Sequence, residues 1–173
     1  MAPAGQQEVR AAWENTLRAG QLYAKCTKVH AKVCKEKGTV ETVVRGVVET
    51  RKAYQAGDYM VVNPAGERYA IDGPVFRKRY LVDAPEPAQT AELDEEGFQL
   101  FIACGRCWAK RLTQAECEER FPGSSFMASW GEAMRVAPGD YLAVPAPAGG
   151  EVYRIEGDVF SKTYAPVQLP PLY

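Results

Sequence analysis

The sequence predicts a mainly β protein of the α+β class, in which two pseudo-symmetric small β-sheet or half-barrel modules pack together and an N-terminal helix precedes them. The main observation is a block of sequence that occurs twice, beginning at Gly57-Asp58-Tyr59 and again at Gly139-Asp140-Tyr141. The second copy follows 82 residues later, counted from Asp58 to Asp140. A module of about 60 residues is marginal alone, so we expect the two copies to bury a common core.

Each copy of the block predicts a hairpin followed by a short helical turn. In the first copy, Asp58–Val62 and Glu67–Ile71 have the composition of two short strands, with Asn63-Pro64-Ala65-Gly66 as the loop between them. The loop of the second copy is two residues longer, as loops accept insertions that paired strands do not. Gly73-Pro74-Val75-Phe76 and Gly157-Asp158-Val159-Phe160 predict a turn of helix that carries the phenylalanine into the core.

The segments outside the block also predict helices and strands. Residues 6–22 place apolar side chains near one face of a helix, and residues 22–34 look extended. Residues 39–50 are dense in Val and Thr, which predicts one or two strands with Arg45-Gly46 as a kink or turn. In the second copy this segment is replaced by Thr113-Gln114-Ala115-Glu116, a capping box that predicts a helix through Arg120. A function specific to one copy is therefore expected in this divergent insert.

These patterns divide the chain into five segments. They are an N-terminal helix (1–22), a first repeat module (23–82), a Pro-rich acidic linker (83–97), a second repeat module (98–166) and a Pro-rich tail (167–173). The tail is too short and apolar to fold alone, and it is typical of a segment that lies in a groove.

The charge is divided between the two halves of the sequence. Residues 1–82 hold 14 Lys/Arg and 8 Asp/Glu, and residues 83–173 hold 7 and 14, for a net charge of −1. Halves of opposite sign attract each other or attract different partners. A chain this close to neutral lacks the field of a nucleic-acid-binding protein.

Membrane and secretion signals are not apparent in the sequence. No apolar run approaches 18 residues, so we expect no transmembrane segment. The N-terminus lacks a secretory pattern, and the odd count of five cysteines favours reduced thiols. We therefore expect a soluble intracellular protein, with a removed organellar transit peptide left open.

The repeated block resembles the PGDYG family and related small bacterial and phage proteins. The second copy matches through Pro138-Gly139-Asp140-Tyr141, Gly150-Glu151-Val152-Tyr153 and Phe160-Ser161-Lys162-Thr163-Tyr164. The first copy matches in the same three places but has Ala56 where the family has proline. The resemblance covers about a third of the chain and implies a small β-rich module, with no catalytic residues to carry over.

Residues that recur in both copies are the candidate ligand-binding set. They are Asp58, Tyr59, Glu67, Tyr69, Lys78, Asp140, Tyr141, Glu151, Tyr153 and Lys162. One interpretation is a carboxylate pair in each copy, for acid–base work or for binding a cation or amine, beside an aromatic pocket. In the interpretation that we favour, the aspartates accept hydrogen bonds from nearby backbone N–H groups and the tyrosine rings pack in the core.

The cysteines offer a weaker hypothesis. Cys104-x-x-Cys107 with Cys117 suggests zinc, but a tetrahedral site needs four ligands and there is no second Cys pair at this spacing. We expect no metal and no cofactor. His30, the single histidine, aligns with Trp108 of the second copy, which indicates a position that accommodates a flat ring.

No common hydrolase, nucleotide-binding or zinc-protease motif is present in the sequence, which favours a protein that is not an enzyme. We expect a non-catalytic protein-interaction module or accessory subunit of a larger assembly, with another protein as its partner. The alternative is a small-molecule-binding protein or an unrecognised enzyme with its site in a cleft between the two repeats. Repeated polar groups that are satisfied by backbone favour the first hypothesis, and groups that converge on one cleft favour the second.

Overall fold

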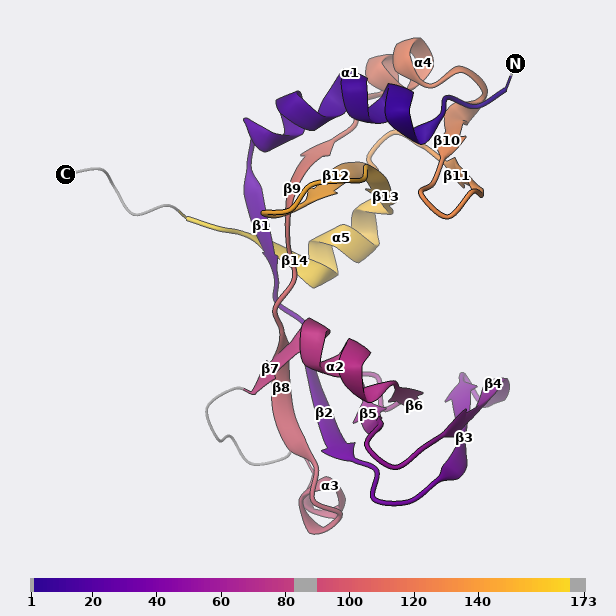
Figure 1. The fold of residues 1–173 in the computed structure, drawn as a ribbon, viewed down its shortest axis with the longest axis vertical. Helices are drawn as coiled ribbons and strands as arrows, with labels where there is room; N and C mark the ends of the chain where they lie inside the picture. Colours follow the sequence, from indigo (N-terminus) through magenta and orange to yellow (C-terminus); the bar gives the residue numbers. More distant parts are fainter. Residues whose placement is uncertain (1, 83–89, 169–173) are drawn as a thin grey trace, which may run out of the picture. The chain divides into compact units, whose positions relative to one another are not determined.

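The protein is mainly β with short helices, as the sequence predicts, in a computed structural model that describes residues 2–82 and 90–168 (Figure 1). It forms two compact units: unit 1 comprises residues 1–25 and 105–173, and unit 2 comprises residues 26–104. The chain therefore passes between the units twice, after Lys25 and after Cys104. Among the described residues, no helix is long and apolar enough to cross a membrane.

Unit 2 is built on an open five-stranded antiparallel sheet. Its order is β6 (Arg68–Ile71), β5 (Tyr59–Val62), β2 (Lys28–Val33), β8 (Gln99–Ala103) and β7 (Tyr80–Val82). Two short helices accompany it, α2 (Gly73–Arg79) and α3 (Ala91–Glu95). A separate hairpin of β3 (Gly38–Val44) and β4 (Val47–Tyr54) turns at Arg45 and Gly46, which have φ angles of 50° and 79°. This is the two-residue turn that the sequence predicts for the Val/Thr segment.

Unit 1 is built on an equivalent open sheet. Its order is β13 (Tyr153–Ile155), β12 (Tyr141–Pro145), β9 (Arg106–Arg111), β1 (Leu22–Lys25) and β14 (Tyr164–Pro166). The helices of this unit are α1 (Gln6–Arg18), α4 (Gln114–Arg120) and α5 (Gly157–Thr163). A 3-10 turn, η1 (Pro122–Ser124), leads to the small hairpin of β10 (Ser125–Met127) and β11 (Ala133–Arg135). The predicted capping box is present, because Thr113 Oγ accepts from Glu116 N and the Glu116 carboxylate accepts from Thr113 N.

The two sheets correspond strand for strand, and their pairing registers are the same. Tyr59 pairs with Val33 on one side and Ile71 on the other. Tyr141 pairs in the same way with Arg111 and Ile155. The last strand is equally matched, since Tyr80 lies opposite Ala103 and Tyr164 lies opposite Lys25.

The exchange of one strand between the two halves of the sequence was not predicted. Strand β1, from the first half, lies between β9 and β14 of the second half. Strand β8, from the second half, lies between β2 and β7 of the first half. The compact units therefore depart from the modules expected at 23–82 and 98–166, because residues 23–25 belong to unit 1 and residues 98–104 to unit 2.

The exchange also changes the expected separation of charge. Unit 2 contains 11 Lys/Arg and 12 Asp/Glu, and unit 1 contains 10 and 10, so each unit is close to neutral. The acidic segment before β8 forms ion pairs inside unit 2: Glu96 lies 3.0 Å from Arg68 and 3.4 Å from Lys32. The opposite charges of the two halves are thus neutralised within a unit.

The expected linker contains structure. Residues 91–95 form α3, whose Thr90 side chain accepts a hydrogen bond from Leu93 N. The rest of that linker, residues 83–89, lies outside the described residues, as do residues 169–173 of the expected tail. The N-terminal helix ends at Arg18, four residues earlier than predicted.

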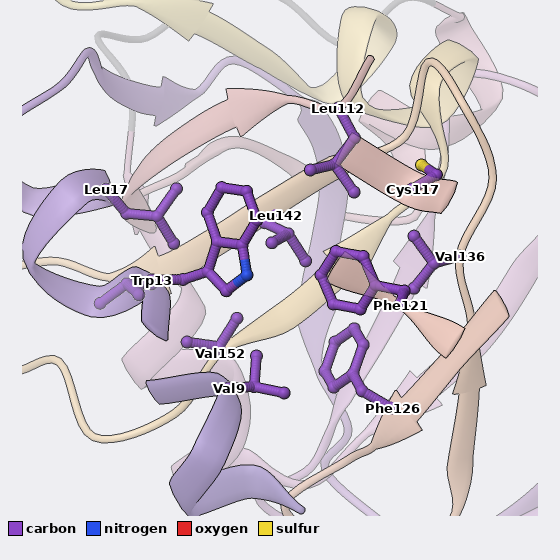
Figure 2. Packing of buried hydrophobic residues seen from close by; sticks show 11 residues of the cluster. Val9, Trp13, Leu17, Leu112, Cys117, Phe121, Phe126, Val136, Leu142 and Val152 are labelled. Atoms are coloured by element: carbon purple, nitrogen blue, oxygen red, sulfur yellow. The ribbon is translucent and has the colours of Figure 1, made fainter. Parts of the chain in front are cut away.

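The larger apolar core of unit 1 lies under α1. Its buried members are Val9, Trp13, Leu17, Leu112, Cys117, Phe121, Phe126, Val136, Leu142, Val144 and Val152. Figure 2 shows the helix side chains Trp13 and Leu17 beside Leu142 of the sheet. The indole of Trp13 stacks on Phe121 at 5.9 Å between ring centroids. Helix α1 is therefore an integral layer of unit 1 rather than an appendage.

Candidate functional site

The aspartate of each Gly-Asp-Tyr block is engaged by backbone groups. Asp58 accepts from Gln55 N at 2.9 Å and from Gly73 N, the first residue of α2, at 3.1 Å. These bonds hold the pKa of Asp58 below its usual range. Asp140 accepts from Ala137 N at 3.0 Å and lies 3.7 Å from Arg154 Nε. Each carboxylate therefore stabilises the loop before its strand and has the environment of a structural group.

The glycines around the block allow two backbone segments to approach closely. Gly57 and Gly139 have φ angles of 93° and 91°, which favour glycine. A Cβ atom on Gly73 would lie 2.4 Å from the carbonyl oxygen of Gly57, and one on Gly157 would lie 2.5 Å from that of Gly139. The first turn of α2 or α5 is thereby pressed against the start of the block, which explains why the two motifs occur together.

The tyrosines of the block form a stack of rings with the predicted core phenylalanine. In unit 2, Phe76 lies between Tyr59 and Tyr80, at centroid distances of 3.9 Å and 4.8 Å. In unit 1, Phe160 lies between Tyr141 and Tyr164, at 3.8 Å and 4.9 Å. Both phenylalanines are almost completely buried. The tyrosine rings thus serve packing, as we expected from their amphipathic character.

A fourth ring in each stack comes from the exchanged strand. Phe101 of β8 meets Phe76 edge-on at 5.0 Å, and Tyr23 of β1 meets Phe160 edge-on at 4.8 Å. Each aromatic cluster is therefore completed by a residue from the other half of the sequence. Sequence reasoning missed this role, although Tyr23 and Phe101 are 78 residues apart, the same offset that aligns His30 with Trp108.

The remaining tyrosines lie at the edge of the same clusters. Tyr69 is half-buried near Tyr80, and burial raises its pKa to about 12. Burial also raises the pKa of Tyr153, which lies beside Tyr164 and Cys107, above its usual range. Both phenols therefore stay protonated in neutral solution and act as hydrogen-bonding groups rather than bases.

The repeated carboxylates do not come together within a unit. Asp58 precedes the first residue of β5, whereas Glu67 lies at the opposite end of the β5–β6 hairpin and accepts from Asn63 Nδ2 at 2.8 Å. Glu151 lies beyond the far end of β12 from Asp140 and accepts from Ser129 Oγ at 2.6 Å. The lysine candidates, Lys78 and Lys162, are exposed on α2 and α5. This arrangement has no paired carboxylates for acid–base catalysis.

The cysteine candidates for zinc are separated by the fold. Cys107 lies in the cluster around Phe160, where burial raises its pKa to about 11. Cys117 belongs to the cluster under α1. Cys104 is part of unit 2 and donates to Lys78 O at 3.2 Å. Among the described residues, no group of three or more His, Cys, Asp or Glu side chains could hold a metal ion.

The exposed apolar side chains gather on the β3–β4 hairpin. We define the hairpin tip as Val43, Val44, Val47 and Val48, which pair across the two-residue turn. Val43, Val47 and Val48 are 44%, 64% and 42% exposed. The hairpin is held against the edge of β6, because Thr42 Oγ1, next to the tip, donates to Arg68 O and Lys52 Nζ donates to Ala70 O. A firmly held hairpin therefore presents branched apolar groups to solvent.

The sequence contained a partial signal for this surface. The density of Val and Thr predicted the strands and their turn, but it did not reveal which face is exposed. Burial alternates without a break along β3, where Val40, Thr42 and Val44 are partly buried and Val43 is exposed, whereas the register shift inserts an extra residue in β4 and disturbs the alternation there. Trp130, 61% exposed in the corresponding insert of unit 1, was not singled out either.

A hollow of about 600 Å³ lies beside the hairpin in unit 2. Its charged lining consists of Lys32, Lys35, Lys37, Arg68, Glu36 and Glu96, and its apolar lining includes Tyr54 and Met60. The cationic side chains exceed the anionic ones by two. The hollow is therefore suited to a small anionic molecule with an apolar part.

Comparison with known proteins found no relative: no family model, no curated protein and no solved structure matches the chain.

Proposed function

We propose that the chain is a tandemly repeated, non-catalytic protein-interaction module, and that it serves as an accessory subunit of a larger assembly. The β3–β4 hairpin tip is its recognition element. The resemblance to the PGDYG family and the intracellular location belong to the same proposal. Its partner is another protein with an apolar surface that accepts the tip.

The observation that carries the proposal is the contrast between repeated and unrepeated residues. The aspartates that recur bind backbone N–H groups, and the rings that recur pack on each other. The hairpin tip belongs to the insert that the second copy replaces, and three of its four valines are exposed. Exposed apolar groups on a short two-stranded sheet are typical of interaction sites, since they are unfavourable in water.

The chemistry of the hairpin indicates what the partner provides. The apolar tip is followed by an ion pair between Glu41 and Arg51 at 2.9 Å, and Arg45 lies in the turn. A complementary surface would bury the valines in an apolar groove and place a carboxylate near Arg45. Burial of the exposed valines would supply the main favourable free energy, and the charges would fix the orientation.

Photo-crosslinking tests this proposal in the natural source of the protein. A photoreactive amino acid at Val47 is expected to crosslink a second polypeptide, whereas the same group at Val159 on α5, which is also an exposed valine, is expected not to. Native mass spectrometry of the gently purified chain should show the same second polypeptide. With the purified partner, Val47→Asp should weaken binding at least about tenfold, because an apolar contact is replaced by a buried charge.

The control for folding is the circular dichroism of Val47→Asp, which should equal that of the unsubstituted chain. Equal crosslinking from positions 47 and 159 would contradict the assignment of the hairpin tip. A monomer mass of 19.1 kDa in the natural source, without a second polypeptide, would contradict the subunit proposal itself.

A second candidate function is the binding of a small anionic molecule in the hollow beside the hairpin. The excess of cationic side chains and the apolar side chains in its lining support it. Ligand-observed NMR with small aromatic carboxylates is the test. Signals that disappear in Lys35→Glu but persist in the control Arg135→Glu, in unit 1, would favour this function, and unchanged signals in both would exclude it.

A further inference from the structure

Two cysteines face each other where the exchanged strands meet. In unit 2, β2 and β8 pair Lys28 with Ile102, and the ladder continues with a bond of 3.0 Å from Ala103 N to Thr27 O. The next residues in this register are Cys26 and Cys104. Beyond them, in unit 1, Lys25 N donates to Gly105 O at 2.8 Å, which keeps the same register. Cys26 and Cys104 are therefore bracketed by ladder hydrogen bonds on both sides.

The position of the pair in the ladder is suited to a cross-strand disulfide. Hydrogen-bonded and non-hydrogen-bonded pairs alternate along an antiparallel ladder. Because Thr27–Ala103 and Lys25–Gly105 carry the hydrogen bonds, Cys26–Cys104 is a non-hydrogen-bonded pair. In such pairs the Cα atoms lie about 4.5 Å apart and the side chains share a face, and disulfides bridge Cα atoms about 4.4 to 6.8 Å apart.

The other cysteines are less accessible. Cys26 is exposed and Cys104 is partly exposed, whereas Cys34, Cys107 and Cys117 are buried. Burial raises the pKa of each of these three thiols, which lowers the fraction of reactive thiolate. An oxidant in solution therefore reaches the facing pair first. All five cysteines are thiols in this structure.

We propose that Cys26 and Cys104 form a reversible disulfide that responds to the cellular redox state. The oxidant is a low-molecular-weight disulfide such as oxidised glutathione. The thiolate of one cysteine attacks the glutathione disulfide and releases one glutathione thiolate. The second cysteine thiolate then attacks the mixed disulfide and releases the other. The protein loses two protons and two electrons, and the glutathione disulfide takes them up to form two molecules of reduced glutathione.

The bond would close the exchange of strands covalently. Cys26 joins β1 to β2, and Cys104 joins β8 to β9, so the disulfide would connect the two crossing points of the chain. The two halves of the sequence would then be unable to separate without reduction. This inference is independent of the hairpin and of the proposed function.

Peptide mapping of the full-length chain after equilibration in glutathione redox buffers tests the proposal. Trypsin cleaves after Lys25, Lys28, Arg79 and Arg106, which places Cys26, Cys104 and Cys107 on three different peptides. We expect peptide 26–28 linked to peptide 80–106. The equilibrium constant for the bond should be at least about 100-fold larger in the folded chain than in concentrated urea, because the fold holds the thiols together.

The matched variants separate this pair from its alternatives. Cys26→Ser and Cys104→Ser should each abolish the linked peptide, and Cys107→Ser should leave it unchanged. A link between peptides 80–106 and 107–110, the product of a Cys104–Cys107 bond, would overturn the proposal. Persistent glutathione adducts on Cys26 and Cys104, or an equal constant in urea, would overturn it as well.

Discussion

The two units have the same sheet but differ in what covers it. In unit 1, the 13-residue helix α1 covers one face and completes a cluster of eleven buried side chains. In unit 2, the five-residue helix α3 contributes to the cluster on the corresponding face, which contains Cys34, Met60, Val62, Leu93 and Phe98. The strand order, the register and the aromatic stack are common to both. The sheet and its aromatic stack are therefore a common scaffold. The helix and side chains that cover one face of the sheet, here called the cover, differ between the units.

One pair of equivalent positions shows how the cover differs. Val152 follows β12 in unit 1 and is buried under α1, whereas its equivalent in unit 2 is Arg68, which pairs with Glu96. Another pair is Trp108 and His30: the indole lies under the guanidinium of Arg18, and His30 is buried with Nε2 lacking a hydrogen-bond partner among the described residues. Unit 1 relies on apolar burial where unit 2 uses polar groups, so we expect unit 1 to be the more stable.

The largest effect should come from the shared scaffold. Phe76→Ala in unit 2 and Phe160→Ala in unit 1 each remove a buried ring from between two tyrosines, which should cost about 3 to 5 kcal/mol of unfolding free energy. All three tryptophans lie in unit 1, so tryptophan fluorescence follows that unit and circular dichroism follows both. Chemical denaturation should show the fluorescence transition shifted by Phe160→Ala and much less by Phe76→Ala.

Equal shifts of the fluorescence transition in both variants would mean that the two units unfold as one. The two units would then form a single cooperative unfolding unit, and their stabilities could not differ. Phe76→Leu and Phe160→Leu are the controls, because they keep most of the buried volume and should each have a smaller effect.

A smaller effect tests the exchange of strands directly. Tyr23→Ala changes the first half of the sequence, yet its ring packs on Phe160 in unit 1. Phe101→Ala changes the second half, yet its ring packs on Phe76 in unit 2. We expect Tyr23→Ala to lower the stability of unit 1, read by tryptophan fluorescence, by about 1 to 3 kcal/mol. Phe101→Ala should instead affect the dichroism of unit 2. The reverse assignment would show that each strand folds onto its own half.

Local structure could be predicted well from this sequence because its signals are local. The Arg45-Gly46 turn, the capping box at Thr113 and the core phenylalanines all depend on residues a few positions apart, and the structure has each of them. The hydrogen bonds of Asp58 to the backbone could be anticipated for the same reason, since an aspartate beside a turn meets nearby backbone N–H groups.

The strand exchange could not be predicted, because the register does not depend on it. If β1 folded back on β2 by a tight hairpin at Cys26, Tyr23 would lie opposite Val29, the residue equivalent to its actual partner Cys107. The side-chain pairs would therefore be of the same kind in both arrangements. Whether the strands exchange or pair within their own half depends on the few residues that join the strands and on which helix covers which sheet. The signal for α3 is short, because it consists of the N-cap Thr90 followed by Glu92 and Asp94, and the Pro-rich acidic composition of the segment favours a linker. The ion pairs of Glu96 with Arg68 and Lys32 join residues too far apart in the sequence to give a local signal.

The smallest expected effect concerns the polar cover of unit 2. The Arg68 guanidinium beside Glu96 holds the pKa of that carboxyl below its usual range, with a further contribution from Lys32. A lowered pKa in the folded state stabilises the fold above the ordinary pKa and is lost as the pH falls through the lowered value. Because both side chains are about 40% exposed, the contribution of this ion pair to the unfolding free energy should be at most about 1 kcal/mol.

Glu96→Gln should therefore lower the stability of unit 2 at neutral pH and remove part of the stability loss that unit 2 shows in acid. Chemical denaturation followed by circular dichroism at pH 7 and in mild acid measures the stability at neutral pH and its loss in acid. The tryptophan fluorescence of unit 1 is the internal control. If the variant and the unsubstituted chain lose stability equally in acid, the ion pair does not stabilise unit 2, and the apolar contacts of Leu93 and Phe98 alone hold its cover in place. The two units would then differ in the size of their cores rather than in the polarity of the groups that cover their sheets.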